Sequence, residues 1–171
     1  MADFVTNITI DDVIDALIAF TQPFVGSAEI VRAQVNRVPM PLDPCVVLTE
    51  IMQVDLERPY STFDSQIEKQ IMHGPSRIDV QMDFYGPLAG EQCRAIQTAF
   101  RTGYASTAFP ESIKPLYTSD GIQSPLITGE QQWESRWTLT ASMQYNSIIT
   151  VPQQFADILT VALIEGADNQ N

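Results

Sequence analysis

The clearest pattern in the sequence is a strict alternation of apolar and polar residues in the segment from Arg77 to Gly86. A period of two predicts a β-strand with one buried face and one polar face. The strand pattern reaches back to Ile67, and we interpret Gly74-Pro75 as a bulge in one bent strand, with a hairpin turn as the alternative. The apolar positions are Ile78, Val80, Met82 and Phe84, and the polar positions are Arg77, Asp79, Gln81 and Asp83.

Two segments before this strand and one after it also predict strands. Alternation from Val31 to Val35 indicates one strand, and residues 45–57 indicate a long strand whose apolar face is interrupted at Glu50. Residues 106–132 are rich in turn-forming residues, and we expect two short strands there, joined by a turn at residues 119–121. The apolar face of the long strand consists of Val46, Leu48, Met52, Val54 and Leu56.

The last third of the chain returns to strand patterns. Residues 133–145 alternate, which places Trp133 and Trp137 on the same side as the apolar neighbours. Residues 155–165 are apolar on nearly both faces and fit a covered strand or a short helix. Their β-branched residues favour the strand.

Two segments show the spacing of an amphipathic helix instead. The first helix is predicted to start after Thr9, which can cap it together with Asp12, and to end near Gln22 because Pro23 follows. The second is predicted to open at Pro87 and to end at Gly103. Their apolar stripes are Ile10, Val13, Ile14, Leu17 and Ile18 in the first helix and Ala89, Cys93, Ile96, Ala99 and Phe100 in the second.

These elements predict an α+β fold with a mostly antiparallel β-sheet packed against two α-helices. The chain has 171 residues, which suits one domain that buries about two thirds of its unfolded surface. We expect a single domain over residues 1–165 and a flexible C-terminal tail over residues 166–171.

Charge and cysteine content narrow the possible functions. The sequence has 21 acidic and nine basic residues, a net charge of −12, which argues against reading the grooves of nucleic acid because phosphate binding needs clustered Lys and Arg. Cys45 and Cys93 are the only cysteines and indicate buried packing in a reducing compartment. The sequence also lacks the apolar run of a membrane span and the basic start of a signal peptide, so we expect synthesis in the cytoplasm.

The residues that could carry catalysis are few, and we predict no catalytic residue, no metal site and no cofactor. His73 is the only histidine, so a zinc site with two imidazoles is excluded and a catalytic triad would depend on this residue beside a bend. The pair Cys45 and His73 lacks a neighbouring base that would activate the thiol. Asp11, Asp12 and Asp15 match a magnesium-diphosphate motif, but acidic residues in a first helical turn are explained by the helix dipole.

The segment from Arg58 to Gln66 has no period and reads as an extended loop. It carries Tyr60 and Phe63, and exposed aromatic residues in such a loop act as interface anchors, unless the loop folds back onto its own sheet. Long two-faced strands with an aromatic loop favour an assembly subunit over an enzyme.

Three stretches taken together resemble the neck and tail-terminator proteins of tailed bacteriophages. They are VRAQVNRVPMPLDPCVVLTEI, RIDVQMDFYGPLAGEQCRAIQTAFRTGYA and ESRWTLTASMQYNSIITVPQQFADIL, and the ordered similarity extends from Ile8 to about Glu165. The resemblance implies a tail-terminator-like α+β subunit that forms a homo-oligomeric ring, generally a hexamer, at the head-proximal end of the tail.

The same resemblance implies the partners and the location. Such a ring ends polymerisation of the tail tube protein, contacts the head-tail connector or neck protein and the sheath protein, and lets genomic DNA pass through its lumen without sequence-specific binding. It implies a virion protein of the tail or neck, made in the host cytoplasm. The acidic balance fits this role, because carboxylates repel the phosphate backbone.

Two groups of residues are the candidate sites. We expect Arg58, Pro59, Tyr60 and Phe63 to contact an adjacent subunit, the tube or the connector, and Asp55, Glu57, Asp79 and Asp83 to face the lumen or a subunit seam. Two alternatives remain open. One is a monomeric small-ligand-binding α+β module with a pocket near Trp133 and Trp137, and the other is an enzyme that uses His73 or the aspartates.

Overall fold

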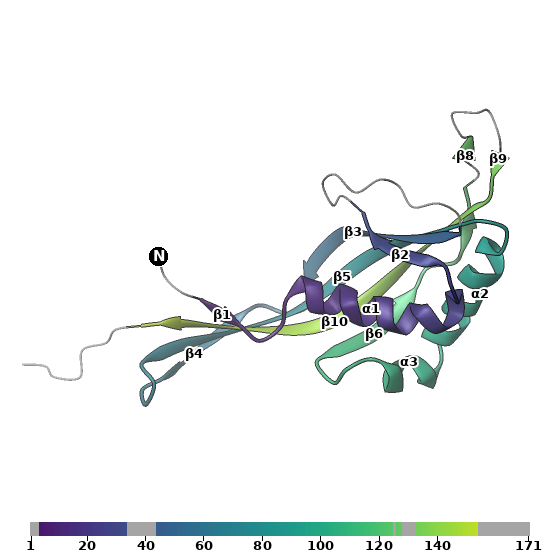
Figure 1. Cartoon of the computed structure of the whole chain (residues 1–171). Coiled ribbons are helices and arrows are strands. Elements are labelled where there is room, and N and C mark those ends of the chain that lie inside the picture. The colour runs from purple at the N-terminus through teal and green to yellow at the C-terminus, as the bar shows by residue number, and fades with distance from the viewer. Residues whose placement is uncertain (1–3, 34–43, 125, 128–132, 154–171) are drawn as a thin grey trace, which may run out of the picture.

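A computed structural model of the chain describes residues 4–33, 44–124, 126–127 and 133–153 (Figure 1). Within these residues, three helices lie against an eight-stranded mixed sheet, and β8 and β9 form a second, two-stranded sheet. The α+β fold is confirmed. The sheet is mostly antiparallel but mixed, because β2 pairs with β3 in parallel. The prediction of two helices was wrong by one, since a third short helix follows the second.

The elements have the following bounds. The helices are α1 (Ile10–Val25), α2 (Ala89–Phe100) and α3 (Gly103–Ala108). The strands are β1 (Val5–Thr6), β2 (Glu29–Arg32), β3 (Cys45–Asp55), β4 (Tyr60–Asp64), β5 (Lys69–Tyr85), β6 (Ile113–Thr118), β7 (Ile122–Gln123), β8 (Leu126–Ile127), β9 (Trp133–Glu134) and β10 (Arg136–Pro152).

Helix α1 starts as the sequence predicts and ends later than predicted. Thr9 and Asp12 form a complete capping box, in which the Thr9 backbone N–H donates to the Asp12 carboxylate at 2.7 Å. Pro23 lies inside the helix, which continues to Val25 and is closed by Gly26 at φ 61°. A proline in the last turn removes only one hydrogen bond, and the burial of Val25 compensates for that loss.

The centre of the sheet is the pair β5 and β10, which run antiparallel over 17 residues each. Their register continues without a shift through Gly74 and Pro75, so the single strand is confirmed and the hairpin alternative is wrong. The predicted bulge is also misplaced. On the other side of β5, β3 stops at Asp55 and β4 starts at Tyr60, because Pro75 has no N–H to continue the ladder.

A register shift does occur in β3, between Glu50 and Met52. The extra residue, Ile51, reverses the alternation, so that Met52 and Val54 lie on the face opposite to Val46 and Leu48. The prediction that all five apolar residues of this strand share one face was therefore wrong. Glu50 remains on the helix-covered face at the sheet edge, where it pairs with Arg32.

The hydrophobic core lies between the sheet and the helices. The alternating segment of β5 behaves as predicted, since Ile78, Val80, Met82 and Phe84 are all buried. They pack in one cluster with the inner faces of α1 and α2. The apolar side of β10, from Trp137 to Tyr145, belongs to the same face, which is why the alternation of both strands could be interpreted from the sequence.

Beyond the helices the sheet narrows into a projection that we call the arm. It consists of β1, β4, residues 69–75 of β5 and residues 146–152 of β10, and Figure 1 shows it extending away from the three helices. The predicted loop at residues 58–66 was wrong, because Tyr60–Asp64 is strand β4 and residues 65–68 form the turn at the arm's tip. Strand β4 forms because it pairs with β5, and its own sequence has no apolar alternation that would predict a strand.

Several sequence predictions fall outside the described residues. These are the strand at residues 155–165, the tail at residues 166–171 and the side chain of Trp133. Residues 119–121 connect β6 and β7, but the predicted turn was wrong, because both strands pair with β10 in the same direction and the chain does not reverse between them. Both cysteines are buried, as predicted.

Candidate assembly surfaces

The polar face of the sheet lies opposite the helices and carries two of the four predicted acidic residues. Asp79 and Asp83 are only 6% and 4% exposed. Asp79 accepts hydrogen bonds from Ser142 at 2.7 Å and from the Arg77 guanidinium at 3.2 Å. Both carboxylates are therefore packed among their neighbours, despite lying on the face without helices.

Asp83 has a similar set of partners. The Arg136 guanidinium lies 3.0 Å from its carboxylate, and Thr138 donates to the same oxygen at 2.5 Å. Gln81 donates to the other oxygen at 2.8 Å. Each arginine also lies over an aromatic ring. The distance to the ring centroid is 5.8 Å from Arg136 to Tyr85 and 6.0 Å from Arg77 to Tyr117. The negative charges of Asp79 and Asp83 are thus balanced by arginines of the same chain.

Asp55 and Glu57 differ from this pair because both are exposed. They lie where β3 ends and the arm begins, and Asp55 accepts one long hydrogen bond from Ser76 at 3.4 Å. The four predicted acidic residues therefore form two groups, one buried and charge-balanced, the other open to solvent.

The predicted interface residues lie together on the arm. Arg58 and Pro59 are exposed in the link between β3 and β4, and Tyr60 and Phe63 are on β4. Tyr60 is 55% exposed and stacks on His73 of β5, with ring centroids 4.7 Å apart and an interplanar angle of 11°. The only histidine is thus part of an aromatic pair on the arm.

Sequence reasoning missed the extent of the arm's apolar surface. Ile67 is 51% exposed in the turn at the tip. Met72 of β5 and Ile149 of β10 are half-buried on the side of the arm that continues the helix-covered face, and Ile148 and Ile71 are half-buried on the other side. The sequence contained a signal for this surface, because residues 69–75 and 146–152 have apolar side chains at both odd and even positions.

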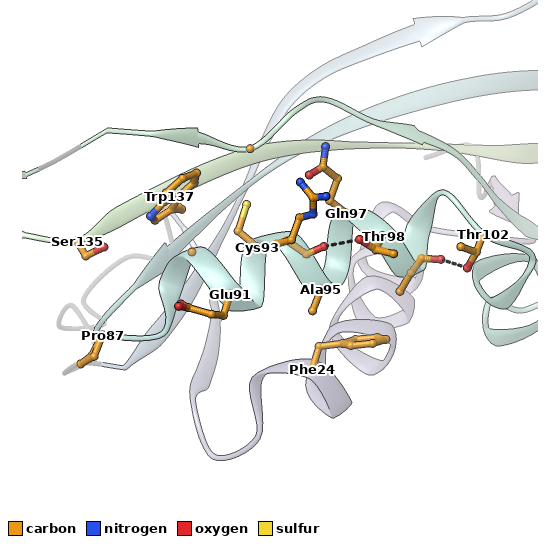
Figure 2. Close-up of a pocket in the computed structure, with 14 residues that line it drawn as sticks. Phe24, Pro87, Glu91, Cys93, Ala95, Gln97, Thr98, Thr102, Ser135 and Trp137 are labelled. Carbon is orange, nitrogen blue, oxygen red and sulfur yellow. Dashed lines mark hydrogen bonds between the residues drawn. The ribbon is translucent and has the colours of Figure 1, made fainter.

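A second surface lies at the other end of the molecule, along α2. An open groove with a volume of about 980 Å³ lies there. Figure 2 shows two of its lining residues, Trp137 on one side of the helix and Phe24 on the other. Arg94 and Glu91 supply the charged groups. Gly90 keeps this end of α2 close to β10, since a Cβ there would lie 3.1 Å from the Trp137 ring.

The groove offers little reactive chemistry. Cys93 borders it, but burial raises the pKa of the Cys93 thiol to about 11, so the thiol is protonated at neutral pH. Trp137 lies beside this groove, as the small-ligand alternative anticipated. The groove is open along the helix and does not enclose a ligand as binding pockets do.

The acidic motif in α1 has structural partners. Asp11 pairs with Arg32, and Asp12 is held in the capping box, which lowers the pKa of its carboxyl group through the hydrogen bonds from Thr9. No group of three or more His, Cys, Asp or Glu residues that could hold a metal ion occurs in the described part of the chain. None of the helices in the described ranges is long and apolar enough to span a membrane.

Comparisons with known proteins found a matching family and similar solved structures. Residues 11–170 match the family described as phage neck terminator protein. Among solved structures, the chain is similar to the sheath/tube terminator of an extracellular contractile injection system, PVC, in its extended state, with a TM-score of 0.49 and 12% sequence identity. The similarity covers 95% of this chain and 66% of the other, so the chain spans just under two thirds of that protein's length. No curated protein matches the sequence.

Proposed function

The chain belongs to the phage neck terminator protein family, and we propose from this premise that six copies form a ring at the head-proximal end of the phage tail. The family is structural, so the protein is a tail component and not an enzyme. In our proposal the ring ends polymerisation of the tail tube, joins the tail to the head connector and surrounds the passing DNA. The chain is made in the host cytoplasm before it enters the virion.

The observation that carries the proposal is the family match over residues 11–170. The arm supports it, because its sheet is narrow, has apolar residues on both faces, and ends in β4, which pairs only with β5 among the described residues. Such a sheet is stabilised by contacts with another molecule. The residues that we propose for contact with a neighbouring subunit, the tube, the sheath or the connector are Arg58, Pro59, Tyr60 and Phe63, all exposed.

Phage that lack this chain test the proposal directly. We expect tails of uncontrolled length, or heads and tails that fail to join, in electron micrographs of the lysate. Native mass spectrometry of the purified neck is expected to show six copies. Tails of normal length joined to heads would contradict the proposed role, whatever the copy number.

The acidic residues are proposed to face the lumen or a subunit seam. Asp55 and Glu57 are the better test of this, because Lys at position 79 or 83 would be buried next to an arginine and would destabilise the fold. The double variant Asp55→Lys with Glu57→Lys is expected to slow DNA ejection, since it places cations where carboxylates repelled phosphate.

The matched control is Asp15→Lys with Glu111→Lys, which makes the same change of charge at two exposed positions away from the arm. Ejection is measured as the rate of DNA release from purified phage after receptor addition. Equal rates for the two double variants would place Asp55 and Glu57 away from the DNA path.

A further inference from the structure

The arm and the α2 groove are the two apolar surfaces at the ends of the molecule. Each includes one end of β10, since Trp137 near the start of the strand lines the groove and Pro152 at its end belongs to the arm. Fifteen residues of β-strand span about 50 Å. Because β10 is paired with β5 over its whole length, the sheet is continuous and the arm cannot fold back into the groove of its own chain.

We infer that the arm of one copy occupies the α2 groove of the next copy around the axis. This inference rests on the proposed ring and names the surfaces that close it. A contact between two different surfaces of the same chain is heterologous, and repeated heterologous contacts close into a ring when the rotation allows. A self-complementary contact would instead stop at two copies.

The apolar parts of the two surfaces are matched in kind. The arm presents Ile67 at its tip, with Met72 and Ile149 behind it. The groove offers Trp137 and Phe24 as a rim on the two sides of α2, as Figure 2 shows. Insertion of the tip would remove apolar surface of both copies from water, which is the main source of affinity in such contacts.

Charges at the two surfaces are also complementary. The tip carries Glu68 and Lys69, and the groove carries Arg94 and Glu91. Among the described residues, Lys69 and Arg94 form no ion pair within the chain, and the same is true of Arg58 and Lys114, whereas the other four described arginines are paired. A chain with a net charge of −12 repels its own copies, so cations left for a neighbour's carboxylates favour this arrangement over random contact.

Disulfide trapping in assembled tails tests the contact. Ile67→Cys places a thiol at the tip and Thr98→Cys places one in the groove, while the native Cys45 and Cys93 are buried. Tails purified from phage that carry the double variant are oxidised and separated on a non-reducing gel. We expect a ladder of covalent multimers of this chain, and no ladder beyond two copies in either single variant.

The gel also identifies any other occupant of the groove. Cross-links from either cysteine to the tube, sheath or connector protein, or monomers alone, would overturn the inference. Native mass of the same neck assembly reports the copy number independently. Six copies without a ladder would leave the proposed ring standing and refute only the contact between arm and groove.

A mixing experiment distinguishes this head-to-tail contact from a symmetric one. Ile67→Asp disables the arm and Thr98→Trp fills the groove, so neither variant alone is expected to form multimers with its own copies. Mixed together, an intact groove on the first meets an intact arm on the second, and species of two copies are expected. Closed rings from Ile67→Asp alone would contradict the inference. Leu116→Asp, at an exposed apolar residue of β6, is the matched control and should assemble normally.

Discussion

One strand, β5, passes through two environments that behave very differently. Residues 76–85 lie under the helices, where apolar side chains are buried on one face and aspartates are paired with arginines on the other. Residues 69–75 belong to the arm, where neither face is covered by a helix of the described chain. The covered half therefore stabilises the fold of the single chain, and the arm carries the residues that we propose for assembly contacts.

The largest expected effect is the difference in stability lost when an isoleucine is truncated in the covered half or in the arm of this strand. Ile78→Ala removes a side chain that is 1% exposed and is expected to cost about 2–5 kcal/mol in free energy of unfolding, because it leaves a cavity. Ile71→Ala, on the half-buried arm, is expected to cost less than about 1 kcal/mol. Urea unfolding of both variants measures the difference. Similar losses would mean that the arm is part of the folding core.

A second test compares the two groups of carboxylates. Asp83→Asn keeps the shape but weakens the four hydrogen bonds from Gln81, Arg136 and Thr138, and it leaves Arg136 without its charged partner. The expected loss is about 2 kcal/mol. Asp55→Asn, at an exposed position, is expected to change stability by less than about 0.5 kcal/mol. Thermal unfolding followed by circular dichroism provides both values. A neutral Asp83→Asn would show that the buried network adds specificity without stability.

The smallest of these effects concerns the cap of the helix that covers the sheet. Thr9→Ala removes the hydroxyl that accepts from the Asp12 backbone N–H at 3.2 Å and is expected to cost about 1 kcal/mol. Thr62→Ala, at an exposed position of β4, should be close to neutral. Urea titrations at pH 7 of the two variants give the comparison.

The same cap adds a dependence on pH. Hydrogen bonds from Thr9 hold the pKa of Asp12 below its usual value of 3.8 in the folded chain. The stabilisation from the ionised Asp12 is therefore present above that value and is lost as the pH falls through the lowered pKa. Asp12→Asn should flatten this part of the stability profile, and an unchanged profile would contradict the assignment.

Sequence patterns predicted the covered half well and the arm poorly. Alternation in β5 identified Ile78 to Phe84 as buried, and the capping box at Thr9 identified the start of α1. Both signals are local, since they depend on spacing within one segment. The candidate residues Tyr60 and Phe63 were found by composition, but the strand that carries them was taken for a loop.

Strand β4 and the bulge in β3 needed information from the partner strand. Tyr60–Asp64 is a strand because β5 offers hydrogen-bonding groups there, and Ile51 is an extra residue because the register with β5 shifts. Neither feature can be predicted from the sequence of the segment itself. The same holds for Asp83, whose polar position predicted a solvent-exposed face and whose partner Arg136 comes from the neighbouring strand β10. The partner of Asp79 is Arg77, two residues away on the same face of β5, so that pair is local in the sequence.

By itself, then, the sequence determined the fold class, the main helices, the buried side of the central strands and the resemblance to tail terminators, because each depends on periodicity or on an ordered set of segments. Only the tertiary structure decided which of the candidate carboxylates are buried, where the sheet extends beyond the helices, and that the apolar tip and the α2 groove lie at opposite ends. Those properties arise from the pairing of residues far apart in the chain, and a pattern within one segment cannot encode the position of its partner.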